Sequence, residues 1–171
     1  MLLTLFPAGA PVARLIAAAL SAAHSGRLPA WTKRACEALA LLAVLVALGV
    51  LGRLVSGGSV SSPLLGFAGF GLSFRIDAVS APLLLLITFL GWIVIRYTRT
   101  YLDGEAREGR FMGWLTAALA CVMLMVTAGN LGQLVAAWIG TSIAVHQLLL
   151  FYPDRDRDDV PDGDPAQARD A

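Results

Sequence analysis

An uncharged run of 43 residues, from Phe111 to Pro153, constrains this chain more than any other feature of its sequence. As a single helix the run would be about 64 Å long, twice the thickness of the apolar core of a bilayer. Gly129 and Asn130 lie near its middle and favour a turn there. The run therefore predicts two membrane-spanning helices joined at this turn, the second of which ends at Pro153.

Charged side chains are also scarce elsewhere in the chain. Of the 171 residues, 57% are hydrophobic and 15% are charged, whereas a soluble domain has about 25% charged residues. The sequence predicts an all-α fold, a polytopic transmembrane helix bundle with about five spans. We expect a transmembrane region over residues 1–153, with spans at about residues 2–23, 36–54, 77–97, 111–128 and 131–152.

The N-terminal apolar run has two interpretations. Ser21, Ala22 and Ala23 resemble the small residues of a signal-peptide cleavage site, but no positive residue precedes the apolar segment and Arg14 lies inside it. We therefore expect a retained first helix. Arg14 is expected to extend to the membrane surface or to face the protein interior, and a role in an ion path is the alternative.

The positive charges indicate the orientation of the predicted spans. If spans one and two, and spans three and four, are connected on the side that also holds the C-terminal tail, that side carries ten Lys and Arg residues and the other side two. The excess predicts that this side is cytoplasmic and that the N-terminus lies outside. Between spans two and three, residues 56–75 are rich in Gly and Ser and predict a loop with short extended pieces around residues 72–76.

The C-terminal tail, residues 154–171, contains seven Asp and three Arg. An EF-hand calcium loop needs a glycine at its sixth position and a glutamate at its twelfth. Counting from Asp154, the sixth residue is Asp159, and the tail has no glutamate. We therefore expect a polar, disordered tail.

Three polar residues in the last predicted span are candidates for a proton path: Thr141, Ser142 and His146. Ser142 and His146 are four residues apart and share one helix face. An imidazole can carry protons near neutral pH, and a titratable side chain inside a membrane is a functional candidate. The alternatives are hydrogen bonding between helices or a place at the membrane interface for His146, and for the hydroxyls bonding to their own helix or to a neighbour.

Two segments of the chain carry a resemblance to a known family. They are FRIDAVSAPLLLLITFLGWIVIRYTRTYLDGEAREGRF and TAGNLGQLVAAWIGTSIAVHQLLLFYPDR. Together they resemble the proton-conducting membrane subunits related to NADH-quinone oxidoreductase subunit L and to cation/proton antiporter subunits. The resemblance covers about half of the chain. The positions that match the family's motifs are Asp77, Arg96, Tyr97, Tyr101, Arg110, Asn130 and Trp138.

The sequence departs from the respiratory members of this family after Trp138. They have a membrane glutamate there, whereas this chain has Ile139. The ending from Ser142 to Arg155 resembles the DabB branch, the partner of the inorganic-carbon uptake protein DabA. That resemblance implies proton movement coupled to conversion of CO2 to bicarbonate in a bacterial inner membrane. A respiratory or antiporter subunit, and an inactive fragment or membrane scaffold, are the alternatives.

The resemblance also sets expectations about cofactors and partners. Zinc is expected only in a DabA-like partner. The two cysteines, Cys36 and Cys121, have no metal or redox spacing, and the chain has no nucleotide-binding fingerprint. We expect no catalytic, cofactor-binding or metal site in this chain, and as partners the lipid bilayer and other membrane subunits, with no nucleic acid. Because family members have many more helices, we expect a truncated, split or degenerate version of such a subunit.

Overall fold

The computed structural model describes residues 6–24, 26–62, 65–67, 70–101 and 107–150. Within them the chain folds into five α-helices, which confirms the expected all-α helix bundle. The predicted tail, residues 154–171, lies outside the described residues. The helices are α1 (Gly9–Ala22), preceded by a short 3-10 turn η1 (Phe6–Ala8), α2 (Ala30–Gly57), α3 (Ser80–Tyr101), α4 (Glu108–Val126) and α5 (Leu131–Leu149).

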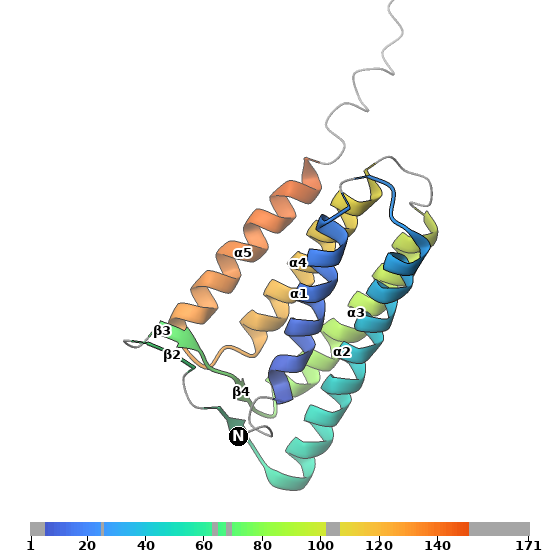
Figure 1. Cartoon of the computed structure of the whole chain (residues 1–171). Coiled ribbons are helices and arrows are strands. Elements are labelled where there is room, and N and C mark those ends of the chain that lie inside the picture. Colours follow the sequence, from blue (N-terminus) through green and yellow to red (C-terminus); the bar gives the residue numbers. More distant parts are fainter. Residues whose placement is uncertain (1–5, 25, 63–64, 68–69, 102–106, 151–171) are drawn as a thin grey trace, which may run out of the picture.

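The first four helices lie side by side, and α5 packs against α4 at the edge of the bundle (Figure 1). The ends of α1, α3 and α5 and the starts of α2 and α4 lie together at one end, called here the loop end (Figure 1). Small residues let the helices approach closely: Ala40, Ala43 and Ala47 follow one face of α2 and are fully buried. Large apolar side chains such as Leu45 and Leu48 point outward instead.

Three of the described helices are long and apolar enough to cross a membrane, judged by length and composition: α2, α3 and α4. The first helix, α1, is also apolar but has 14 residues. Outward-facing leucines and inward-facing alanines suit such an environment, because lipid tails solvate large apolar side chains as well as a protein core does.

Four short strands lie at the other end of the bundle, called here the strand end (Figure 1). β1 (Val60–Ser61) pairs antiparallel with β4 (Arg75–Ile76), and β2 (Leu65–Phe67) pairs antiparallel with β3 (Phe70–Leu72). The expectation of extended pieces around residues 72–76 agrees with β3 and β4. Gly58 ends α2 with a φ of +76°, and its amide donates to the Leu54 carbonyl.

The helices extend beyond the expected apolar cores. We expected α2 to begin near residue 36, but it begins at Ala30, directly after Pro29. We also expected α3 to end near residue 97, but it continues to Tyr101. In both cases hydropathy marks where charged residues begin, whereas the backbone hydrogen bonds of the helix continue past that point.

Gly109 offers a test of how tightly the loop end is packed. It is buried, its amide donates to the Gly26 carbonyl, and an added Cβ would collide with the His24 carbonyl oxygen. Gly109→Ala is therefore expected to lower the thermal unfolding temperature in detergent, at a cost of about 2 kcal/mol or more.

Gly52→Ala is the matched control, because an added Cβ at Gly52 of α2 meets open space. Alanine also favours a helix over glycine, so this variant should unfold at the wild-type temperature or above it. Equal unfolding temperatures for Gly109→Ala and the wild type would contradict the packing described here.

Candidate functional site

The two hydroxyl candidates of α5 bond to their own helix. Thr141 Oγ1 donates to the Ala137 carbonyl over 2.9 Å, and Ser142 Oγ donates to the Trp138 carbonyl over 3.1 Å. Thr141 is half-buried, whereas Ser142 is exposed. Their donors are therefore satisfied, while the lone pairs of both oxygens can still accept a proton donor.

His146 lies one turn beyond Ser142 and is exposed. The buried residues of α5 lie on its other face: Gln133, Ala137 and Ala144. Ser142 and His146 thus occupy a face of α5 that the described residues do not cover. If α5 crosses the membrane as the sequence predicts, other protein would have to cover this face, because polar side chains within a membrane helix nearly always face protein or a water-filled cavity.

Trp138 and Ile139 lie on the same helix and are largely exposed, at 63% and 54%. Ile139 lines a hollow of about 960 Å³ at the strand end of α5, together with Leu72, Asn130 and Gln133. The hollow is apolar toward Ile139 and polar toward Asn130. The position after Trp138 therefore borders a space large enough for further side chains or lipid, but it supplies no carboxylate.

A cluster of hydrogen bonds fixes the start of α5. Asn130 Oδ1 accepts from the Gln133 amide (2.7 Å), and its Nδ2 donates to the Gly71 carbonyl (2.9 Å) and to Ser73 Oγ (3.0 Å). Gln133 Oε1 accepts from the Ser73 amide (2.9 Å), and its Nε2 donates to the Leu124 carbonyl (3.2 Å). Asn130, a family-motif position, thus caps α5 and ties it to the strands.

Two backbone hydrogen bonds strengthen this attachment. The Gly129 amide donates to the Ser73 carbonyl (2.7 Å), and the Arg75 amide donates to the Thr127 carbonyl (3.0 Å). The segment 71–75 therefore runs beside the α4–α5 turn, and hydrogen bonds join it to the residues before and after Ala128. We call these contacts, with those of Asn130 and Gln133, the turn seam.

Asp77 opens α3 at the strand end. Its Oδ1 accepts from the amides of Ser80 (2.9 Å) and Val79 (3.0 Å), and Ser80 Oγ accepts from the Asp77 amide (2.8 Å). The amides of Ser80 and Val79 lower the pKa of Asp77 below its usual value, because they stabilise the carboxylate. The geometry gives Asp77 a capping role at the start of α3, where a carboxylate also interacts favourably with the helix dipole.

The remaining motif residues lie at the loop end. Arg96 Nη1 lies 3.8 Å from Glu37 Oε1, and its guanidinium lies 5.7 Å from the centre of the Trp92 ring. Arg99 pairs with the same Glu37 carboxylate. Tyr97 and Tyr101 are exposed and stack with ring centres 5.5 Å apart. These aromatic and cationic groups are typical of a membrane–water interface.

A second ion pair at the loop end is more deeply buried. Lys33 Nζ of α2 lies 2.8 Å from Oε1 of the fully buried Glu108, in the first turn of α4. Glu108 Oε2 accepts from the Leu28 amide over 3.4 Å. A carboxylate here also interacts favourably with the N-terminal end of the α4 dipole.

Arg14 is fully buried inside the bundle. Its Nη2 donates to the Thr88 carbonyl of α3 over 3.3 Å, and Gly91 leaves room for it, since an added Cβ would lie 2.8 Å from Nη2. Within the described residues, Nε and Nη1 have no hydrogen-bond partner. Of the roles expected for Arg14, the structure therefore favours a side chain that faces the protein interior.

The structure thus divides the predicted residues into three places. Asp77 and Asn130 lie at the strand end, while Arg96, Tyr97, Tyr101 and Arg110 belong to the loop end. Thr141, Ser142, His146 and Trp138 lie along α5. Among the described residues, no group of three or more His, Cys, Asp or Glu side chains could hold a metal ion.

Sequence reasoning missed Glu37, Glu108 and Gln133. A signal for Glu37 was available, because a glutamate within an apolar span requires a cationic partner. Gln133 gave none, since its partners Ser73 and Leu124 belong to separate elements.

Comparison with known proteins confirms the expected resemblance. Residues 66–112 match the family described as the N-terminus of chain 5 of NADH-ubiquinone oxidoreductase (complex I). The probable inorganic carbon transporter subunit DabB2 of Halothiobacillus neapolitanus is 36% identical over 130 residues, which are 74% of this chain and 23% of that protein. The corresponding DabB of Hydrogenovibrio crunogenus is 32% identical over 83 residues, 48% of this chain and 16% of that protein.

More distant similarity extends to respiratory subunits. NADH-ubiquinone oxidoreductase chain 5 of Acanthamoeba castellanii is 29% identical over 82 residues, 48% of this chain and 12% of that protein. The chain therefore matches less than a quarter of the length of each of these relatives. With its apolar helices, this similarity identifies a multi-pass membrane protein.

The capping role of Asn130 can be tested by substitution. Asn130→Ala removes the acceptor for the Gln133 amide and both donors to the strands, so it should destabilise the chain by about 1–3 kcal/mol. Asn130→Asp keeps the acceptor and loses the donors, so its unfolding temperature should lie between those of the wild type and Asn130→Ala. Thermal unfolding in detergent measures the stabilities of the three proteins. An unfolding temperature of Asn130→Ala equal to that of the wild type would refute the role of this residue in the turn seam.

The Lys33–Glu108 pair can be tested with a double-mutant cycle. Glu108→Ala leaves Lys33 without its carboxylate in a largely buried position, and should cost about 3 kcal/mol. Lys33→Ala should be costly for the same reason, and the double variant should cost less than the sum of the two. Additive losses in the free energy of unfolding would mean that the two side chains do not interact.

Proposed function

We propose that this chain acts as the N-terminal part of a proton-conducting membrane subunit that couples proton movement to inorganic carbon uptake. The observation that carries the proposal is the similarity to DabB2, which extends over 130 residues of this chain. The activity, substrate and partner of the complete assembly are part of the proposal.

The polar residues of α5 supply the candidate path within this chain. Thr141, Ser142 and His146 follow one another along about one and a half turns, and two of them lie on the uncovered face of α5. A hydroxyl can accept and donate a hydrogen bond, and an imidazole can gain and lose a proton near neutral pH. Together they form a short relay that other helices would have to enclose.

The carbon-uptake function is preferred over a respiratory one because of Ile139. A respiratory subunit of this family would have a carboxylate after the tryptophan to exchange protons, and an isoleucine side chain cannot do so. The match of residues 66–112 to the chain 5 family favours the alternative, a component of NADH-quinone oxidoreductase or of a cation/proton antiporter. That region contains neither Trp138 nor Ile139, so the match does not test whether the missing carboxylate after the tryptophan separates this chain from respiratory subunits.

The proposal includes a partner and a location. A DabA-like subunit would bind at the loop end and would carry the zinc that hydrates CO2, since this chain is expected to hold no metal. The excess of Lys and Arg at the loop end supports a bacterial inner-membrane protein with this end in the cytoplasm. The C-terminal tail would then be cytoplasmic as well.

The function can be tested by growth of the source organism at low and high CO2. Deletion of the gene should prevent growth at low CO2 and leave growth at high CO2 intact. Wild type should restore growth, whereas His146→Ala should not, because loss of a proton relay slows transport by about tenfold or more. Ile143→Ala, which changes another exposed residue of α5, is the matched control and should restore growth.

Two outcomes would contradict different parts of the proposal. Normal growth of the deletion strain at low CO2 would contradict the proposed carbon-uptake function. Full restoration of growth by His146→Ala would contradict the proposed proton relay and would favour a role of this chain as a membrane scaffold. Membrane levels of each variant must match the wild type for either comparison.

A further inference from the structure

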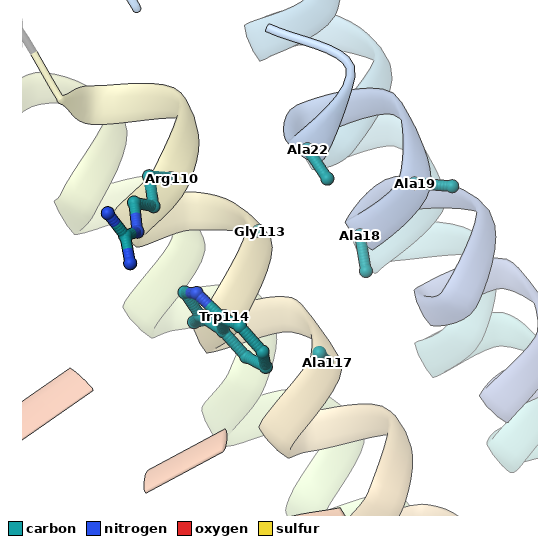
Figure 2. Close-up of a pocket in the computed structure, with 7 residues that line it drawn as sticks. All are labelled: Ala18, Ala19, Ala22, Arg110, Gly113, Trp114 and Ala117. Atoms are coloured by element: carbon teal, nitrogen blue, oxygen red, sulfur yellow. The ribbon is translucent and has the colours of Figure 1, made fainter. Parts of the chain in front are cut away.

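We propose that the groove between α1 and α4 binds an acidic phospholipid, whose phosphate pairs with Arg110 and whose acyl chain lies along the helix contact. The groove has a volume of about 540 Å³ and is lined by residues of these two helices near the loop end (Figure 2). Its walls are alanines and Gly113, with Trp114 and Arg110 as the larger side chains.

The groove exists because α1 and α4 meet through small residues. A Cβ added at Gly113 would lie 3.5 Å from the Ala22 amide nitrogen, so the two backbones approach closely here. Ala18, Ala19 and Ala117 border the contact but are too small to fill the space beside it. The result is an apolar channel bounded by two helix backbones.

Arg110 provides the charge at one end of this channel. It is exposed, and the described carboxylates nearby are engaged elsewhere: Glu108 with Lys33, and Glu37 with Arg96 and Arg99. Within the described residues, no ion pair neutralises Arg110. Its guanidinium is therefore available to an anion, and it matches phosphate oxygens with two parallel hydrogen bonds.

The polarity of the groove matches the polarity of a phospholipid. Arg110 lies in the first turn of α4, and Ala117 lies about 10 Å farther along the helix axis. Trp114 is one turn beyond Arg110, and Figure 2 shows both side chains on the same side of α4. Tryptophan favours the level of the headgroups, and basic pockets between membrane helices are suited to acidic headgroups.

The occupant can be identified by native mass spectrometry of the full chain released from detergent. Wild type mixed with equal amounts of phosphatidylglycerol and phosphatidylcholine should retain phosphatidylglycerol. Arg110→Gln should reduce this retention by about fivefold, the expected effect of one basic residue near an acidic headgroup. Ala19→Leu should reduce retention of both lipids, because the larger side chain enters the groove.

Matched controls lie outside the groove. Arg53→Gln and Ala38→Leu change exposed residues of α2 and should retain phosphatidylglycerol as the wild type does. Arg110→Lys keeps the charge but loses the two parallel hydrogen bonds of the guanidinium, so its retention of phosphatidylglycerol should lie between those of the wild type and Arg110→Gln. If Arg110→Gln fails to fold, which circular dichroism in detergent would detect, reduced retention by Arg110→Lys supports the proposal and unchanged retention contradicts it.

Three results would overturn the proposal. They are equal retention of phosphatidylcholine by the wild type, unchanged retention by Arg110→Gln, and unchanged retention by Ala19→Leu. Crosslinking from Ala19 to a second polypeptide in native membranes, with no lipid retained by the purified chain, would likewise overturn it, because the groove would then be a helix-binding surface. None of these outcomes depends on the carbon-uptake function.

Discussion

The hydrogen bonds of the turn seam determine where α5 lies, and the polar residues of the proposed proton path lie on that helix. α5 packs along α4 and buries few of its own side chains within the described residues, namely Gln133, Ala137 and Ala144. Asn130 and Gln133 add a polar attachment, because they join the α4–α5 turn to residues 71–75. Ser73 and Gln133 are buried, so breaking these bonds would leave polar groups without water or another partner, which makes the attachment costly to break.

The same limit on polar groups explains where the charges lie. Glu37, Glu108 and Lys33 are found at the loop end, and each has a partner of opposite charge. Arg14 differs from these three residues, since it lies inside the bundle and has a carbonyl oxygen as its hydrogen-bond acceptor. The stability of the bundle thus rests on close contacts between small residues in the interior and on ion pairs at the loop end.

Much of this fold could be predicted from the sequence. The number of helices followed from the uncharged runs, and the α4–α5 turn followed from Gly129 and Asn130. The helix ends could not be predicted as well, because α2 extends back to Lys33, which pairs with Glu108, and α3 extends forward to Arg99, which pairs with Glu37. Such pairs join residues far apart in the chain, and hydropathy contains no information about them.

The candidate site was predicted in part. Ser142 and His146 share a face as their spacing indicated, but the sequence did not reveal that this face is exposed. Burial depends on which helices pack together, and the packing of α5 depends on Gln133, which no motif marks. The resemblance that named Asn130 and Arg110 as family positions likewise gave no physical role, and the structure shows one as a cap and the other beside a groove.

If proton movement through an assembly containing this chain drives inorganic carbon uptake, as proposed, the rate of uptake must follow the proton gradient. The most direct measurement is the uptake of radiolabelled inorganic carbon by cells under an imposed pH gradient, with and without the gene. Uptake should increase with the inward proton gradient, collapse when a protonophore is added, and disappear without the gene. Uptake that depends on the gene but does not respond to the gradient would contradict the proposal.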